Sequence, residues 1–174
     1  MRTQVRYRVG QTQDVEAIQE VELAAGQRFL DVGMPEIAAD GPPERRVLRG
    51  LIDREQLWVA TTASGQVIGY CMAVAVDRDA HIDQVSVHCD YARQGIGAEL
   101  VEHACEWATN REATRISVFT FDNVPWNAPY YRRLGFEDLD IDNVDKELAV
   151  IWQAERLTDL ANWVRVALAR PLTN

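Results

Sequence analysis

Hydrophobic and polar residues alternate along several short segments of the chain. Near its start, Val5, Tyr7 and Val9 alternate with two arginines, and a period of two residues is typical of a strand with one face in solvent. Longer apolar segments bounded by turn residues predict an antiparallel meander, with strands over residues 56–62, 67–76 and 80–88.

A helical period follows in the middle of the chain. Apolar residues recur three and four positions apart within 95–110, at Leu100, Val101, Ala104, Cys105 and Ala108, which predicts an amphipathic helix. Because this helix lies between expected strands at 80–88 and 114–121, it should be the crossover between two parallel neighbours. Other helices are expected over 13–29, 44–53, 127–134 and 144–157, and a loop over 33–43.

Two further expected strands, at 136–141 and 163–170, complete the pattern. The sequence therefore predicts an α+β protein of the three-layer α/β/α kind, with a mixed, mostly antiparallel central sheet of about seven strands. A length of 174 residues suits a single domain, residues 1–174, with a sizeable core.

Composition narrows the function classes. No apolar run approaches the roughly eighteen residues of a membrane span, so none is expected. The segment Met1–Tyr7 lacks the apolar core of a signal peptide, which favours a cytoplasmic protein. A net charge of −9 speaks against nucleic acid as the main partner. An acidic surface would suit a cationic substrate, although acidity also simply confers solubility.

The cysteines are three in number, Cys71, Cys89 and Cys105, and none is in CxxC spacing. Reduced thiols that pack in the interior are therefore expected, Cys89 included, rather than a disulfide framework. The three histidines add no metal-ligand spacing to the cysteines, so the sequence predicts no metal site.

The segment 85–101 carries the first candidate for chemistry. Its strand passes through a turn containing Arg93, Gly95 and Gly97 into the helix described above. Glycines let the backbone approach a ligand closely, and a helix N-terminus offers N–H groups and a positive dipole end to a phosphate. The pattern predicts a diphosphate site, although a Gly-x-Gly turn can also be a plain tight connection. The dinucleotide-binding fingerprint is excluded because it needs a Gly or Ala at the position of Leu100. The phosphate-binding P-loop is excluded because no Gly-Lys-Ser or Gly-Lys-Thr follows.

A second motif, Asn127-Ala-Pro-Tyr-Tyr-Arg-Arg-Leu-Gly-Phe136, follows later in the chain. Together with Tyr91-Ala-Arg-Gln-Gly-Ile-Gly-Ala-Glu-Leu-Val101, it makes the chain resemble the GCN5-related N-acetyltransferase (GNAT) superfamily over about residues 4–142. The resemblance implies that family's acyl-CoA N-acyltransferase fold and acetyl-CoA as the acetyl-donating cosubstrate.

The resemblance also implies which residues hold acetyl-CoA. Backbone groups of one strand would pair with the pantetheine amides and supply an oxyanion hole, and loop amides would hold the pyrophosphate. Ala92 stands where the family often has Gln or Arg. Val124 stands where the family often has an asparagine, and Asn127 is the preferred candidate for the role of that asparagine. The implied cofactor-binding residues are Val85, Ser86, Val87, Arg93, Gln94, Gly95, Ile96, Gly97, Ala98, Asn127 and Tyr131.

For catalysis, the resemblance implies direct attack of a neutral amine on the thioester in a ternary complex, with no metal. Tyr131 is assigned as the general acid for the departing thiolate by its motif position, and packing beside CoA is its alternative role. Asp83 is the candidate base, acting through water from a strand where family members often place a carboxylate. His81 and Glu22 are the alternatives.

The favoured function is thus an acetyl-CoA-dependent N-acetyltransferase acting on a primary amine of a small molecule or peptide. The alternative is a non-catalytic acyl-CoA-binding regulatory module on the same fold, and a third hypothesis is a protein that binds NAD or ATP. The acceptor amine stays open, because the regions expected to contact it carry no motif. Dimerisation is common in the family, so a homodimer is among the arrangements to expect.

Overall fold

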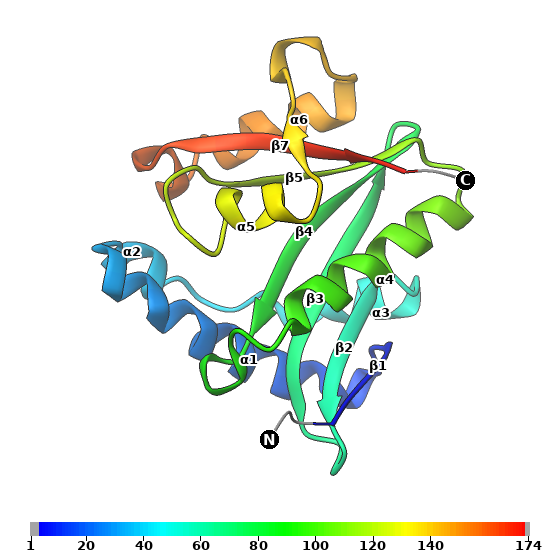
Figure 1. Ribbon diagram of the computed structural model, residues 1–174, viewed down its shortest axis with the longest axis vertical. Coiled ribbons are helices and arrows are strands. Elements are labelled where there is room, and N and C mark those ends of the chain that lie inside the picture. Colours follow the sequence, from blue (N-terminus) through cyan, green and yellow to red (C-terminus); the bar gives the residue numbers. More distant parts are fainter. Residues whose placement is uncertain (1–3, 173–174) are drawn as a thin grey trace. The chain divides into compact units, whose positions relative to one another are not determined.

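The computed structural model describes residues 4–172, so Met1–Thr3 of the polar N-terminal segment lie outside the described residues. Each strand expected from the periodicity is present, although the one expected over 136–141 has only two residues (Figure 1). The strands are β1 (Val5–Val9), β2 (Leu57–Thr62), β3 (Val67–Val76), β4 (Asp79–Val87), β5 (Arg115–Phe121), β6 (Glu137–Asp138) and β7 (Arg165–Pro171).

The helices follow the expected order with two corrections. The helix expected over 13–29 is divided, because 3-10 segments precede and follow α1, and the loop expected over 33–43 contains α2. Gly33 ends the second 3-10 segment with a φ of 72°, and Pro35 takes the first turn of α2. The helices are α1 (Val15–Gly26), α2 (Pro35–Ala38), α3 (Arg45–Asp53), α4 (Ile96–Asn110), α5 (Ala128–Arg133) and α6 (Lys146–Glu155).

The seven strands form one sheet in the order β1-β2-β3-β4-β5-β7-β6. Neighbouring strands are antiparallel in the pairs β1–β2, β2–β3, β5–β7 and β6–β7, whereas β4 and β5 are parallel. Since α4 joins β4 to β5, the predicted crossover is confirmed. The mixed sheet with helices also confirms the predicted fold class.

The chain divides into two compact units. The first consists of residues up to 73 together with 84–104, and the second consists of 74–83 together with the residues from 105 onward. Because β3 and β4 each cross from one unit to the other, the division runs through strands and not through a linker. The single domain expected from the length stays a prediction.

In the first unit, α4 supplies much of the apolar packing. The side chains that formed its predicted stripe within this unit, Leu100, Val101 and Ala104, are fully buried. Burying a leucine or valine side chain contributes about 1.5–3 kcal/mol. Gly69 of β3 allows the close approach of this helix, since a Cβ there would lie 3.3 Å from Leu100 and 3.2 Å from the carbonyl oxygen of Ser86.

The second unit has its own core. Phe119 of β5 and Ala167 of β7 pack with Val76 and with Leu148 of α6. Phe119 also meets the ring of Trp152 edge to face at 4.9 Å between centroids. The helix α6 is therefore held on this unit by the side chains of Leu148 and Trp152.

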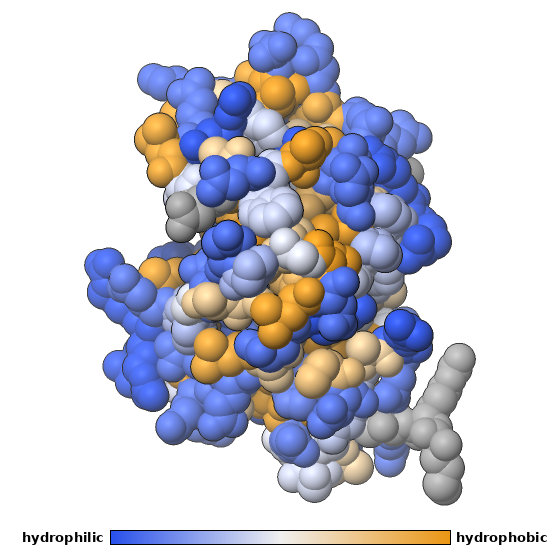
Figure 2. Space-filling view, turned by 90° about the vertical axis from the view of Figure 1, so that its left-hand side faces the viewer, coloured by the Kyte–Doolittle hydropathy of each residue, from blue (hydrophilic) through white to orange (hydrophobic). Residues whose placement is uncertain are grey.

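The surface is predominantly hydrophilic on the face drawn in Figure 2, with hydrophobic residues in groups between charged and polar ones. This mixture is ordinary for a folded chain, because polar atoms alone cannot cover the surface. Within the described residues, no helix combines the length and apolar character that crossing a membrane requires.

Candidate functional site

The loop between β4 and α4 has an unusual backbone. A 3-10 turn, Cys89–Tyr91, follows β4, and the next residues reach α4 through two left-handed positions, Arg93 with φ 62° and Gly95 with φ 82°. A Cβ added at Gly95 would meet no atom within 4 Å. Glycine is thus favoured there by the backbone conformation and not by crowding within the protein.

This loop leads directly into the N-terminus of α4, a helix of fifteen residues. The first four N–H groups of a helix have no partner within it, and the helix dipole adds positive potential at that end. The side chains of Arg93 and Gln94 are exposed, whereas Ile96 is buried with 2% of its surface exposed. The side chain of Ile96 therefore anchors the helix, and its predicted role in binding falls to its amide.

A second arginine lies near this loop, and sequence reasoning missed it. Burial lowers the pKa of Arg28, and the charge of Arg93 lowers it further, while Asp31 and Cys89 oppose that shift. Two guanidinium groups whose charges repel each other favour an anion such as a phosphate near them. Arg28 belongs to the 3-10 segment after α1 and to no motif, so no sequence signal marked it.

The end of β4 supplies the three strand residues of the predicted site. Val85 and Val87 are half-buried, and Ser86 is buried with 7% of its surface exposed. The hydroxyl of Ser86 donates a 2.5 Å hydrogen bond to Glu22. Because that side chain is already engaged, Ser86 can contribute to ligand binding only through its backbone, as expected for a docking strand.

Glu22 of α1 is the centre of a hydrogen-bond network in the first unit. Its Oε2 accepts from the Tyr70 hydroxyl at 2.7 Å and from Ser86, and its Oε1 accepts from the Gln84 amide at 3.1 Å. Two carboxylate oxygens offer about four acceptor positions in total. Three are occupied here, so Glu22 ties α1 to β3 and β4.

The second motif lies in the second unit, on α5. Tyr131 is 8% exposed, and its ring meets the ring of Phe136 edge to face at 5.4 Å between centroids. Asn127 precedes this helix, and its Oδ1 accepts a 2.8 Å hydrogen bond from Thr120 of β5. Tyr131 therefore lies on a short helix whose preceding residue, Asn127, is held to β5 by a side-chain hydrogen bond.

The end of α5 explains the Leu-Gly-Phe part of the motif. Gly135 has a φ of 87°, the left-handed conformation common after a helix, and its amide donates to the carbonyl of Arg132. Arg170 of β7 donates a 3.1 Å hydrogen bond to the carbonyl of Leu134. The helix carrying Tyr131 is thus stopped by glycine and held at its carboxyl end by an arginine of β7.

The two base candidates on β4 have opposite surroundings. His81 is 1% exposed, its Nδ1 is 2.9 Å from the Ser117 hydroxyl, and burial lowers its pKa to about 3. Asp83 reaches solvent, yet the protein atoms around its carboxyl group raise its pKa by desolvation. The alternative role of His81 as base is therefore wrong, because a substrate cannot touch a buried, hydrogen-bonded ring. Asp83 keeps the role as a prediction.

An ion pair in the same unit was also missed by the sequence. Glu155 at the end of α6 accepts a short hydrogen bond from Arg165 of β7. Burial raises the pKa of Glu155, Arg165 lowers it, and the charge of Asp83 adds to the rise. Asp83 and Glu155 are thus close enough to influence each other, although they lie far apart in the sequence.

The predicted site residues therefore fall into two sets. Val85–Val87 and Arg93–Ala98 belong to the first unit, and Asp83, Asn127 and Tyr131 belong to the second. The first set comes from the end of β4 and the start of α4, whereas the second comes from the middle of β4 and from α5 with the residue that precedes it. The prediction that Cys89 packs in the interior is wrong, because Cys89 is exposed, whereas Cys71 and Cys105 are buried as expected.

Comparison with known families and structures agrees with these motifs. The model of the family described as "Acetyltransferase (GNAT) family" matches residues 23–136. That range contains both the loop before α4 and the complete motif that ends at Phe136.

Solved structures share the fold at low sequence identity. The N-acetylglutamate synthase of Neisseria gonorrhoeae, complexed with coenzyme A and N-acetyl-glutamate, has a TM-score of 0.76 and 14% identity. The alignment covers 100% of this chain and 36% of the synthase chain, so this chain spans about a third of that protein.

Two shorter proteins align over nearly their whole length. The ribosomal-protein-S18-alanine N-acetyltransferase of Escherichia coli has a TM-score of 0.66 and 16% identity, with 98% of this chain and 96% of that chain covered. The PaiA N-acetyltransferase of Thermoplasma acidophilum, in complex with coenzyme A, has a TM-score of 0.66 and 14% identity, with 97% and 99% covered.

Proposed function

This chain belongs to the acetyltransferase (GNAT) family, and we propose that it transfers an acetyl group from acetyl-CoA to a primary amine of a small molecule or peptide. Family membership supports acyl-CoA N-acyltransferase activity in general. The observation that carries the finer proposal is the loop before α4, where Arg93 and Gly95 take left-handed conformations ahead of the helix N-terminus.

Binding of the cofactor follows from this backbone. Amides from Arg93 to Ala98 would bind the pyrophosphate, with Arg28 and Arg93 adding charge that favours an anion. The backbone of Val85 and Val87 would pair with the pantetheine amides as an added strand does. A backbone N–H from this stretch would then donate to the thioester oxygen, where negative charge develops during the reaction.

The reaction needs two proton movements. The acceptor amine must be neutral to attack, because an alkylammonium has no lone pair, and its ordinary pKa is about 10.4. Attack forms the C–N bond and places negative charge on the thioester oxygen. Collapse then breaks the C–S bond, so the amide and the CoA thiolate leave as separate products. The amine proton passes to the base, and the thiolate receives one from the acid.

We assign the acid and the base on different grounds. Tyr131 is the acid by its motif position. Asp83 is the base, directly or through water, because desolvation raises its pKa toward the range in which a carboxylate can take a proton near neutral pH. Glu22 is the weaker candidate, because three donors already occupy its oxygens.

The first test is thermal unfolding of the whole chain with acetyl-CoA, with CoA, and with NAD or ATP as controls. Ligand at about a hundred times its dissociation constant adds roughly 2.7 kcal/mol of stability. We expect acetyl-CoA and CoA to raise the unfolding temperature and NAD and ATP to leave it unchanged. A shift with NAD or ATP alone would overturn the proposal.

Turnover separates the enzyme from the regulatory module. Release of free CoA thiol is measured with a panel of primary amines, including amino acids, polyamines and peptides with free N-termini. Acetylation of one of them supports the enzyme. Binding of acetyl-CoA without thiol release for any member of the panel would favour the module.

A further inference from the structure

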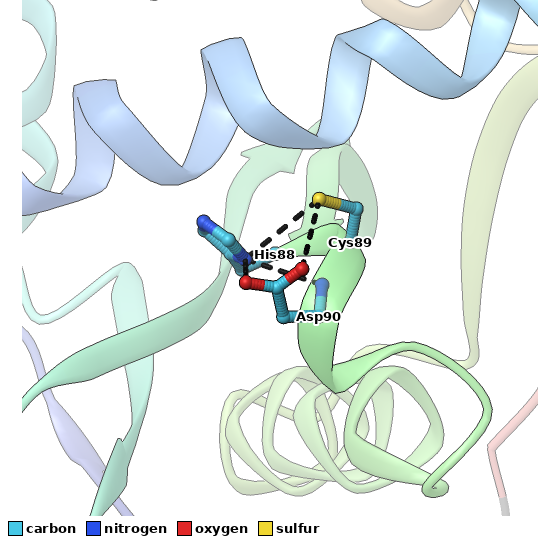
Figure 3. A group of neighbouring side chains, drawn as sticks. All are labelled: His88, Cys89 and Asp90. Atoms are coloured by element: carbon cyan, nitrogen blue, oxygen red, sulfur yellow. Dashed lines mark hydrogen bonds and ion pairs between the residues drawn. The ribbon is translucent and has the colours of Figure 1, made fainter.

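Three consecutive side chains at the end of β4 point toward one another (Figure 3). The Nδ1 of His88 lies 3.9 Å from the Sγ of Cys89 and 3.7 Å from one carboxylate oxygen of Asp90, whose other oxygen lies 3.7 Å from that Sγ. One ligand atom from each residue falls within 4.8 Å of the other two. A nitrogen, a sulfur and an oxygen are thus gathered around one point.

The separations between these atoms are close to those of a tetrahedral zinc site. Zinc binds nitrogen and oxygen at about 2.0–2.2 Å and sulfur at about 2.3 Å, so its ligand atoms stand about 3.4 to 3.6 Å apart. The three separations in this structure exceed those values by a few tenths of an ångström at most. A small rotation of the Asp90 carboxylate would let one oxygen serve both contacts.

The 3-10 turn brings these neighbours together. His88 occupies the cap position of the turn Cys89–Tyr91, and its Nδ1 accepts a 3.2 Å hydrogen bond from the amide of Asp90. Consecutive residues of a strand point to opposite faces. Because β4 ends at Val87, the chain turns before that alternation can separate the three side chains.

We propose that His88, Cys89 and Asp90 bind a thiophilic divalent cation of the zinc type. All three are reachable from solvent, since Cys89 is exposed and the side chains of His88 and Asp90 keep 29% and 78% of their surface. The cation replaces the Cys89 thiol proton, which is released to water, and a water molecule completes the fourth position.

The donor set selects the class of metal. Thiolate and imidazole ligands favour zinc, copper or cobalt, whereas magnesium and calcium prefer sites made of oxygen alone. Only Asp90 among the three residues offers oxygen. The sequence predicted no metal site because metal ligands are recognised by spaced pairs such as CxxC. His88, Cys89 and Asp90 are adjacent in the sequence and so have no such spacing.

The site also has a mechanical consequence. The lone pair of the His88 Nδ1 that now accepts the Asp90 amide would be taken by the cation, so the amide would have to find another partner. Cation binding should therefore change the turn that leads into Arg93 and Gly95. This consequence concerns the loop itself and does not depend on the proposed activity.

The test is titration of the whole, reduced chain with Co²⁺, which reports a bound thiolate by charge-transfer absorption, followed by displacement with Zn²⁺. We expect the absorption to appear and to disappear when Zn²⁺ is added. Cys89→Ser should abolish it and weaken Zn²⁺ binding by roughly tenfold or more, since even supporting partners of a ligand are worth 10–100-fold. Mg²⁺ should not compete.

Two controls keep the result decisive. Cys89→Ser retains the buried thiols Cys71 and Cys105, so absorption that persists in this variant would come from them and would overturn the proposal. Asp53→Asn removes an exposed carboxylate of α3. It changes the net charge by the same amount as Asp90→Asn, which removes a carboxylate of the proposed site. Equal loss of Zn²⁺ affinity in these two variants would show binding to the general acidic surface, which also overturns the proposal.

Discussion

The two motifs of this chain are built in different ways. The loop before α4 is defined by backbone conformation, with left-handed residues at Arg93 and Gly95 and exposed side chains at Arg93 and Gln94. The α5 motif is defined by side chains, with Tyr131 buried against Phe136 and Asn127 bonded to Thr120. The first region presents amides to a ligand, and the second presents one phenol.

This difference predicts which changes each region tolerates. In the loop, a side chain can vary as long as the backbone keeps its path, which accounts for Ala92 at a place where the family often has Gln or Arg. In α5, a single atom can carry the function while the fold around it stays intact. Substitutions should therefore separate binding, which depends on the loop, from turnover, which depends on α5 and Asp83.

The largest expected effect is that of Tyr131→Phe. Loss of the phenol oxygen removes the proposed proton donor and keeps the aromatic packing on Phe136, so kcat should fall roughly 10²-fold or more. Steady-state kinetics and calorimetric titration with acetyl-CoA check this. Tyr130→Phe is the matched control and should keep its activity. Unchanged kcat in the Tyr131 variant would remove this residue from the mechanism.

Asp83→Asn should lower kcat by about 10²-fold, the lower end of what general acid–base groups supply. In the wild-type protein, the acid limb of the pH profile of kcat should lie above the ordinary pKa of an aspartate, because desolvation raises that of Asp83. The limb should vanish in the variant. A limb that survives in Asp83→Asn would assign the base to another group.

A binding effect without a turnover effect is expected from Gly95→Val. A left-handed φ costs a β-branched residue on the order of 1–3 kcal/mol, so the loop should move and acetyl-CoA should bind roughly tenfold more weakly. Gly65→Val is the control, since Gly65 has a φ of 89° and equally open surroundings in the turn between β2 and β3. Equal losses of affinity in both variants would contradict the assignment of the loop.

The smallest effect concerns stability in acid and belongs to the second unit. The folded-state pKa of His81 is about 3, below its ordinary 6.5, so between these values the unfolded chain binds a proton that the native chain does not. The free energy of unfolding should fall as the pH falls below 6.5, by about 1 kcal/mol at pH 5.5. Urea unfolding at both pH values measures this, and His81→Asn should remove that part of the pH dependence.

Periodicity was sufficient to predict most of the fold. The stripe of α4 is a strong signal because its apolar residues are buried in the core. The strand expected over 136–141 reduces to β6, which ends at Asp138, because Asp140 already caps a 3-10 turn through its side chain. The loop expected over 33–43 contains α2 because Pro35 can begin a helix as readily as end one.

The site was only partly predictable. The loop and the α5 motif carry local patterns, so residues such as Gly95 and Tyr131 could be named from the sequence. Arg28 and Glu155 could not, because each acts on a partner that is distant in the sequence and neither belongs to a periodic or motif position. Cys89 was placed in the interior because cysteines are usually buried, whereas it follows the end of β4 on an exposed turn.

The order of strands in the second unit has a consequence for biosynthesis. β7 lies between β5 and β6 and pairs with both, with seven residue pairs to β5 and two to β6. A ribosome makes β5 and β6 before β7, so both must wait with unpaired edges until β7 (Arg165–Pro171) has emerged. Nascent chains arrested before Arg165 should therefore expose this sheet to chaperones and proteases, whereas chains long enough to release β7 should close it.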